Sequence, residues 1–279
     1  MNKYTGLIVL CFFVFSSSTS ENKKTDVAIA NDYFVRYRKE LPLPPGELMV
    51  KTALFFLETP YGTATLEINE TEQLVVNLRE LDCMTLVENC LALTRTVCSG
   101  TVTYKHFTQE LQRIRYRGGI IDGYPSRLHY TSDWITDNVA KQILSDKTKE
   151  TGGKSLQFNL NFMSTHPESY KALKNNPDDI ANMQKIENAV NQRTYYYIPK
   201  NEISGKEKLI QNGDIICFVT SIEGLDISHL GIAYRKNGML TFIHASSQAN
   251  KVIVNPESIA GYCAKMKRNV GVVVVRIEN

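Results

Sequence analysis

The spacing of apolar positions changes character along this chain. Helical spacing over 47–57 and 83–97 predicts helices, and further helices are expected over 104–116 and 178–192. Later, short β-branched runs separated by turn residues predict strands over 215–219, 230–234, 240–243, 251–254 and 270–277. Helices followed by a sheet indicate the α+β class.

A thiol stands at the start of one of these helices. A predicted short strand over Leu74–Leu78 leads to Cys83, which is in phase with the apolar stripe Leu86, Val87, Cys90, Leu91 and Val97. The free N–H groups and the dipole at a helix start stabilise a thiolate, whereas a cysteine deep in an apolar helix stays protonated and inert. Cys83 is therefore a candidate nucleophile, although most helical cysteines are core residues.

Two histidines flank a predicted hairpin. Asn237-Gly238 is a strong signal for a two-residue turn between antiparallel strands. Such a turn brings His229 and His244 within one or two positions of facing each other at one end of a sheet. A helix carrying Cys83 and packed on that sheet would complete a set of one thiol and two imidazoles. Taken singly, a histidine at a strand end is usually structural.

The first residues have the pattern of a secretory signal. Lys3 precedes an apolar stretch over 7–15 and a run of small polar residues over 16–20, so we expect a signal peptide over 1–20 and a mature protein that starts near Glu21. The apolar stretch is shorter than the roughly 20 residues that span a bilayer. Export to the periplasm is the expectation.

Lipid anchoring is the weaker interpretation of this signal. Leu10 precedes Cys11 where lipidation requires a small residue. The rest of the chain divides into a polar N-terminal segment over 21–40, expected to be disordered or loosely attached over 21–32, and a single domain over 41–279. Mixed signals over about 145–210 indicate an insertion in that domain.

Composition and charge exclude several classes. The formal net charge is +3 and 43% of residues are hydrophobic, which is ordinary for a globular domain and gives no electrostatic reason for nucleic-acid binding. No later segment is long and apolar enough to span a membrane. Five cysteines follow the signal, an odd number that leaves at least one free thiol, and their spacing does not suggest a structural zinc site.

Four segments resemble, in the same chain order, the motifs of NlpC-type papain-like cell-wall cysteine hydrolases. They are Pro60-Tyr61-Gly62, Asp82-Cys83-Met84-Thr85-Leu86-Val87, Ser228-His229-Leu230-Gly231-Ile232-Ala233 and Ile243-His244-Ala245-Ser246. Others resemble the N-acetylmuramoyl-L-alanine amidase-like branch of that superfamily: Leu78-Arg79-Glu80, Ser126-Arg127-Leu128-His129-Tyr130, Asp133-Trp134 and Arg268-Asn269-Val270-Gly271. Together they cover most of residues 45–277.

The resemblance implies a papain-like α+β core with N-terminal helices, in which the nucleophile helix packs on an antiparallel sheet. It implies Cys83 as nucleophile, His229 as general base and His244 as the third member that orients the base. Tyr61 matches a tyrosine held near the nucleophile. Asp82 matches an acidic position that helps to fix the peptide end of the substrate.

Other positions concern substrate contacts. Arg127, His129 and Tyr130 match a segment that we assign to the substrate pocket. Met84 departs from the family pattern, which usually has a small hydroxyl residue at this position. The departure concerns the substrate contact that such a hydroxyl makes and does not affect the assignment of Cys83 as nucleophile.

The expected activity is hydrolysis of the amide between N-acetylmuramic acid and L-alanine, in peptidoglycan or muropeptide fragments, through a thioester of Cys83. No metal or other cofactor is required. The choice of this amide rests on the resemblance alone, so a γ-D-glutamyl-diamino acid endopeptidase is the alternative within the same chemistry. A non-catalytic peptidoglycan-binding module and a zinc amidase using His229 and His244 are the alternatives from other classes.

Overall fold

The computed structural model describes residues 24–39 and 43–278. The expected signal peptide and residues 21–23 lie outside this part of the chain. Within it, no helix is long and apolar enough to cross a membrane.

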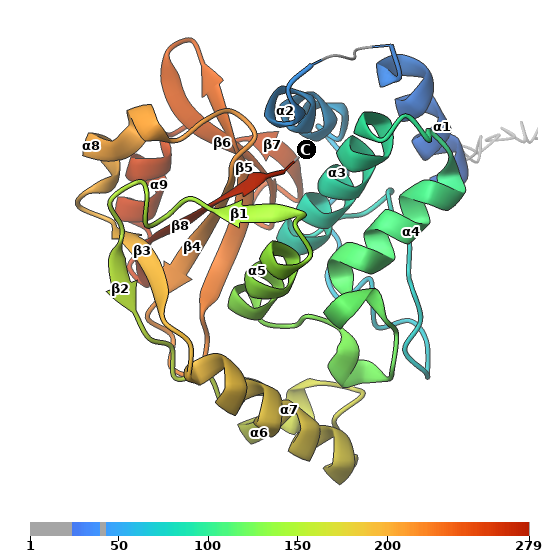
Figure 1. Cartoon of the computed structure of the whole chain (residues 1–279), viewed down its shortest axis with the longest axis vertical. Helices are drawn as coiled ribbons and strands as arrows, with labels where there is room; N and C mark the ends of the chain where they lie inside the picture. Colours follow the sequence, from blue (N-terminus) through green and yellow to red (C-terminus); the bar gives the residue numbers. More distant parts are fainter. Residues whose placement is uncertain (1–23, 40–42, 279) are drawn as a thin grey trace, which may run out of the picture.

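An antiparallel sheet forms the centre of the molecule (Figure 1). Its strands are β1 (Leu144–Asp146), β2 (Lys154–Leu156), β3 (Tyr195–Pro199), β4 (Ile215–Thr220), β5 (Ile227–Lys236), β6 (Met239–Ser246), β7 (Lys251–Val254) and β8 (Asn269–Ile277). They lie in the order β2-β3-β8-β4-β5-β6-β7, with β1 paired to β8, and neighbouring strands run antiparallel.

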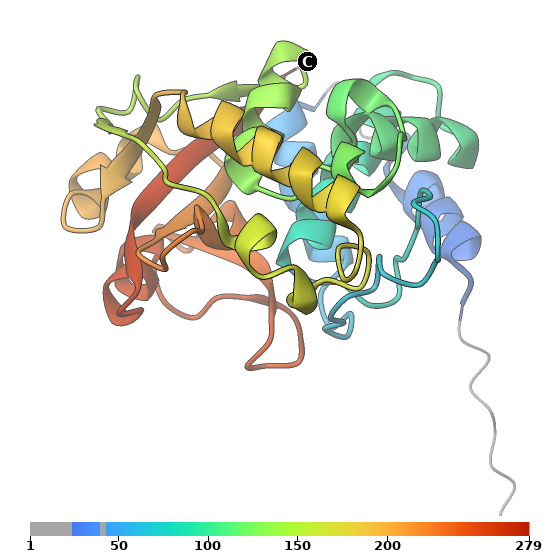
Figure 2. The ribbon, with the colours of Figure 1, turned by 90° about the horizontal axis from the view of Figure 1, so that it is seen from below.

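Helices cover both faces of this sheet. The α-helices are α1 (Asp26–Tyr37), α2 (Pro45–Phe55), α3 (Cys83–Cys98), α4 (Tyr104–Arg115), α5 (Thr131–Ala140), α6 (Phe162–Thr165), α7 (Pro177–Asn191), α8 (Ile203–Lys206) and α9 (Ile259–Lys265). Short 3-10 turns are η1 (Arg117–Gly119), η2 (Tyr124–Ser126), η3 (Pro167–Ser169) and η4 (Glu207–Leu209). Helices α2 and α3 pack against one face, α8 and α9 lie on the other, and Figure 2 shows α7 from below.

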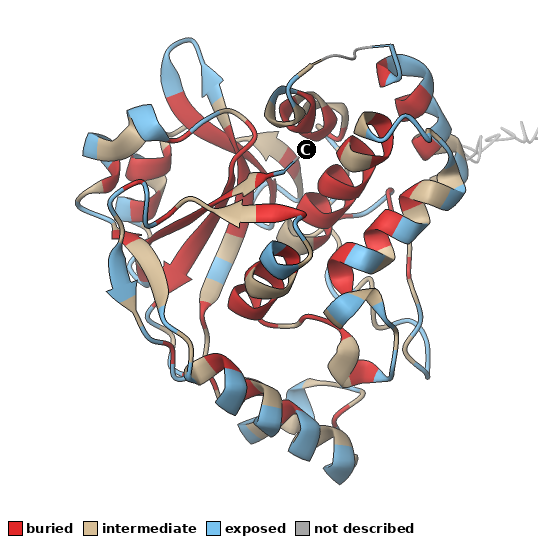
Figure 3. Ribbon diagram, viewed as in Figure 1, coloured by how far each residue is buried: buried red, intermediate tan, exposed pale blue. Residues whose placement is uncertain are grey.

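Two apolar cores follow from the alternation of side chains along the strands. Leu230 and Ile232 of β5 point into the larger core with α3, whereas Ala233 belongs to the smaller core under α9. Helix α3 is buried along most of its length (Figure 3). Helix α3 is therefore held firmly against β5 and β6, the strands of the predicted histidine hairpin.

The predicted hairpin and the five predicted late strands are confirmed. Lys236 pairs with Met239, and the two residues between them have positive φ angles, 51° at Asn237 and 84° at Gly238, as a primed two-residue turn requires. Each of the five predicted late strands corresponds to one of β4 to β8. The predicted helices correspond to α2, α3, α4 and α7 within a few residues.

The predicted strand over Leu74–Leu78 is wrong. This segment forms no strand and pairs with none in the described structure. Side chains satisfy its backbone instead: Arg115 Nη1 donates to the carbonyl of Val75 at 2.6 Å, and the N–H of Leu78 donates to Asp26 Oδ1 at 2.8 Å. A Val- and Leu-rich run fits a buried extended segment as well as a strand.

The expectation of a loosely attached N-terminal segment is also wrong for its described residues. Residues 26–37 form α1, which buries Ala30, Tyr33, Phe34 and Tyr37 at helical spacing. Tyr33 hydrogen-bonds to Thr52 of α2 at 2.8 Å. The helix begins with polar residues, and its buried aromatic residues lie in its second half. For this reason the sequence did not predict a packed helix here.

The segment over 145–210 contains structure that the sequence did not predict. Strand β3 pairs with β8 through Ile198 and Val272, and β2 adds a further edge strand. These strands have three to five residues, too few for a reliable alternation pattern. Helix α5, which begins at Thr131, likewise has no counterpart among the helices that the apolar spacing predicts.

Candidate active site

Cys83 is the first residue of α3, as predicted, and Asp82 caps the helix. Asp82 Oδ1 accepts hydrogen bonds from the N–H and the hydroxyl of Thr85 at 2.7 and 2.8 Å, and Thr85 Oγ1 accepts from the N–H of Asp82 at 2.9 Å. This reciprocal capping box fixes where the helix starts. It therefore fixes the position of the thiol.

The environment of this thiol favours its protonated form. The N–H groups of Leu230, Met84 and Cys83 itself lie against the sulfur and favour the thiolate, as expected at a helix start. Burial and the negative charge of Asp82 outweigh them and raise the pKa of Cys83 to about 12. The expectation of a thiolate stabilised at rest is therefore not met.

The two histidines contact each other across β5 and β6. His229 Nε2 lies 2.6 Å from His244 Nδ1, with the rings nearly perpendicular at 85°. Gly231 makes this approach possible, because a Cβ there would lie 2.5 Å from Phe242 Cδ2 and 3.3 Å from His244 Cβ. The register pairs Ile232 with Ile243, so each histidine lies two positions from facing the other.

Both imidazoles are held in the neutral form. Burial lowers the pKa of His229 to about 4. Burial and the neighbouring His229 lower the pKa of His244 to about 3, and the side chain of Asn255 partly opposes this shift. Both rings therefore remain neutral bases well below neutral pH.

The thiol lies beside the strand that carries His229. The sulfur of Cys83 meets the N–H of Leu230, the residue that directly follows His229. Tyr262 of α9 lies near both the histidines and the thiol. Its ring centroid is 6.0 Å from each histidine ring, and burial, followed by the charge of Cys83, raises the pKa of Tyr262 to about 12. Neither Tyr262 nor Asn255 carried a motif that the sequence could have revealed.

Tyr61 lies next to the thiol, as the sequence predicted. Its backbone pairs with Leu81 just before α3, and its N–H donates to the carbonyl of Asn250 at 2.9 Å. Burial, then the charges of Cys83 and Asp82, raises the pKa of Tyr61. The Tyr61 phenol is therefore close enough to Cys83 and Asp82 to feel their charges.

The three residues predicted for the substrate pocket lie in a buried polar network. Arg127 Nη2 donates to Glu67 Oε1 at 2.7 Å, and Arg127 Nε lies 3.3 Å from Glu72 Oε1. His129 Nε2 lies 2.9 Å from the carbonyl of Tyr124, where burial lowers its pKa to about 3.

The third of these residues, Tyr130, donates to Glu187 Oε1 of α7 at 2.7 Å. These contacts give Arg127, His129 and Tyr130 structural partners. A role in substrate binding remains a prediction.

A cavity of about 780 Å³ opens beside the histidines. His229 and His244 line it, together with the turn that follows β6, the segment before α9, and the turn between α9 and β8. Its volume is within the range of about 300–1,000 Å³ that is common for ligand pockets. It is the cavity through which a substrate could reach the imidazoles.

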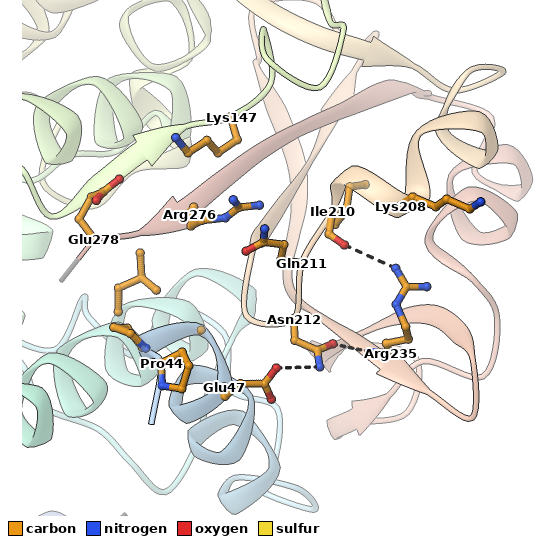
Figure 4. A pocket seen from close by; sticks show the side chains of 13 residues that line it. Pro44, Glu47, Lys147, Lys208, Ile210, Gln211, Asn212, Arg235, Arg276 and Glu278 are labelled. Carbon is orange, nitrogen blue, oxygen red and sulfur yellow. Dashed lines mark hydrogen bonds between the residues drawn. The ribbon is translucent and has the colours of Figure 1, made fainter. Parts of the chain in front are cut away.

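A second cavity, of about 720 Å³, lies at the other end of β5 (Figure 4). Arg235 lines it and is six residues from His229, about 20 Å along a strand. Its polar groups are largely engaged within the protein: Arg276 pairs with Asp214 at 2.7 Å, and Glu47 accepts from Asn212 at 3.2 Å. This cavity is separate from the thiol and the histidines.

Metal binding and disulfides receive no support from the described residues. In residues 24–39 and 43–278, no three His, Cys, Asp or Glu side chains form a group that could hold a metal ion. The five cysteines of this part are free thiols: Cys83, Cys90, Cys98, Cys217 and Cys263.

The described site thus combines a thiol at a helix start with two histidines in contact, and the histidines line a cavity. Residues 51–272 match the family model described as N-acetylmuramoyl-L-alanine amidase-like. The chain therefore belongs to the N-acetylmuramoyl-L-alanine amidase-like family, which makes it an amidase-like hydrolase. None of the curated proteins matches it.

Solved structures agree with this family. The chain is 37% identical to an N-acetylmuramoyl-L-alanine amidase from Bacteroides uniformis, with a TM-score of 0.81, over 84% of this chain and 99% of that one. It is 41% identical to a Bacteroides fragilis protein provisionally described as a xylanase, with a TM-score of 0.79, over 82% of this chain and 100% of that one. A Legionella pneumophila protein with 21% identity and a TM-score of 0.67, over 90% and 94%, shares the fold.

Proposed function

We propose that this protein is a cysteine amidase that hydrolyses the amide between N-acetylmuramic acid and L-alanine of the peptidoglycan stem peptide. The observation that carries the proposal is the contact between His229 and His244. The residue after His229, Leu230, has its N–H at the sulfur of Cys83. The choice of substrate follows from the family description and from the name of the similar B. uniformis amidase.

The mechanism begins from a neutral thiol and a neutral imidazole. Because His229 Nε2 is engaged with His244, Nδ1 is the nitrogen left to take the thiol proton. Cys83 attacks the lactyl carbonyl as its proton moves to His229, and the N–H of Cys83 at the helix start is the candidate donor to the oxyanion. His244 holds the ring of His229 in this tautomer.

The tetrahedral intermediate then expels the amine of L-alanine. The imidazolium of His229 protonates that amine as the C–N bond breaks, which leaves a thioester between the lactyl group and Cys83. Water, deprotonated by His229, attacks the thioester and releases the muramic acid carboxylate and the free thiol. The chemistry needs no metal.

Product analysis tests the proposed bond. Purified muropeptides are incubated with wild-type protein and with Cys83→Ala, and the products are weighed. We expect wild-type protein to release free muramic acid sugar and an intact stem peptide, and Cys83→Ala to release neither. Cleavage inside the stem would support the γ-D-glutamyl endopeptidase alternative, and full turnover by Cys83→Ala would refute thiol catalysis.

The glycosidase description of the B. fragilis protein has no counterpart in the cavity beside the histidines. Glycoside hydrolysis generally uses two carboxyl groups that flank the scissile bond. Within the described residues lining this cavity, Glu257 is the one carboxylate, and it pairs with Lys265 at 2.8 Å.

A non-catalytic module is less favoured, because two histidines buried in contact beside a thiol serve no binding purpose by themselves.

We further propose a papain-like NlpC-type core and export to the periplasm. The order of a nucleophile helix followed by an antiparallel sheet with both histidines supports the first. The charged, apolar and small-residue pattern over residues 1–20 supports the second. Comparing the mass of the secreted protein with that of the full chain tests export.

A further inference from the structure

The side of the sulfur on which the stem peptide lies follows from the proposed mechanism. The amine that leaves must receive its proton from His229, so it lies on the histidine side of the scissile carbon. In the proposed reaction this amine belongs to L-alanine, and the rest of the stem peptide follows it. The cavity of about 780 Å³ lined by His229 and His244 is therefore the place for the stem peptide.

The rim of this cavity carries uncompensated positive charge. Lys265, Lys267 and Arg268 line it, at the end of α9 and in the turn before β8. Lys265 is neutralised by Glu257 at 2.8 Å. Lys267 and Arg268 are exposed, and neither forms an ion pair within the described part of the chain.

The turn that carries these two cations is fixed to the catalytic strand. The carbonyl of Arg268 accepts from the N–H of Ser221 at 2.8 Å. The next residue, Asn269, is buried, and its Oδ1 accepts from Ser228 Oγ at 3.0 Å. Because Ser228 directly precedes His229, the backbone of the turn has a fixed position relative to the base.

We propose that Lys267 and Arg268 bind a carboxylate of the stem peptide, namely the α-carboxylate of D-glutamate, its second residue. This inference rests on the proposed amidase function. In a stem linked through the γ-carboxyl of D-glutamate, that α-carboxylate is free and lies one residue beyond the leaving amine. Two cations without partners on the leaving-group side of the base provide the opposite charge.

A matched pair of substrates tests this assignment. One muropeptide has D-glutamate at the second position and the other has D-isoglutamine, which replaces the carboxylate with a neutral amide. We compare wild-type protein with the variant Lys267→Gln/Arg268→Gln, and with Lys265→Gln as a control whose lost charge already has a partner. Initial rates give kcat/KM for each protein on each substrate.

We expect kcat/KM of wild-type protein to be about tenfold or more higher on the glutamate substrate. This ratio corresponds to the usual free energy of a hydrogen bond to a charged group. The double variant should lose this preference while retaining its rate on the isoglutamine substrate, which also shows that it is folded. Lys265→Gln should keep the preference.

Equal rates of wild-type protein on the two substrates, or equal losses of the double variant on both, would overturn the assignment while leaving the amidase function intact. Failure of wild-type protein to release a stem peptide from either substrate would overturn the proposed function, and this inference with it.

Discussion

His229 Nε2 and His244 Nδ1 lie 2.6 Å apart, so the two rings share a single proton between these nitrogens. One nitrogen must donate and the other accept, which requires a neutral acceptor. Protonating both rings would break this contact and place two charges in a buried site. The pair therefore titrates as a unit, and its state controls whether His229 can act as a base.

Activity should persist under mildly acidic conditions. Because burial lowers the pKa of His229 to about 4, kcat/KM should remain high from pH 7 to about pH 5 and fall below it. Initial rates measured across this range test the prediction. A midpoint near the ordinary imidazole value of about 6.5 would contradict it.

Acid should also destabilise the fold, and the direction follows from the same shifts. Groups whose pKa is lower in the folded state contribute stability that is complete above pH 6.5 and is lost as pH falls toward 4 and 3. Activity recovered after return to pH 7 separates protonation of the pair from irreversible unfolding.

Replacing the two histidines should have unequal effects. His229→Ala should lower kcat by about 10³-fold or more, because it removes the acid and base of both steps. His244→Ala should lower kcat less, by about 10- to 100-fold, and change the acid limb of the pH profile, since it removes the group that orients His229. Equal losses of kcat with unchanged pH profiles would argue against this division of roles.

A metal chelator should leave the rate of wild-type protein unchanged, because the proposed mechanism uses no metal ion.

Asp82 should affect helix stability and thiol reactivity in separable ways. Asp82→Ala removes the cap of α3 and should lower the free energy of unfolding by about 1 kcal/mol. Asp82→Asn keeps an acceptor for the N–H of Thr85. It removes the charge that, after burial, contributes most to the raised pKa of Cys83, so iodoacetamide should alkylate Cys83 faster at pH 8. Peptide mapping identifies the modified cysteine. An unchanged rate for Asp82→Asn would show that burial alone sets the thiol pKa.

Arg127 should matter for stability. Arg127 is 6% exposed and faces Glu67 and Glu72, so Arg127→Gln removes the cation that both carboxylates pair with and should lower the free energy of unfolding, measured in urea, by about 3 kcal/mol. Arg113→Gln is the control, because the 3.8 Å contact of Arg113 with Glu110 is partly exposed and should contribute little. If Arg127 also binds substrate, KM will rise in protein that remains folded.

The sequence by itself determined the elements whose signals are local. An apolar stripe in phase with Cys83 placed this residue at the start of α3, and turn chemistry at Asn237-Gly238 set the hairpin that brings His229 to His244. Each of these depends on residues a few positions apart, so a single sequence contains the necessary information.

Only the tertiary structure decided the electrostatics of the thiol and the partners of the buried polar residues. The pKa of Cys83 depends on desolvation by segments far along the chain, which outweighs the local effect of the helix start. Arg127 pairs with Glu67 and Glu72, 60 and 55 positions earlier, and Leu78 bonds to a carboxylate 52 positions earlier. Contacts at such separations leave no periodic pattern in the sequence, because they depend on how whole elements pack.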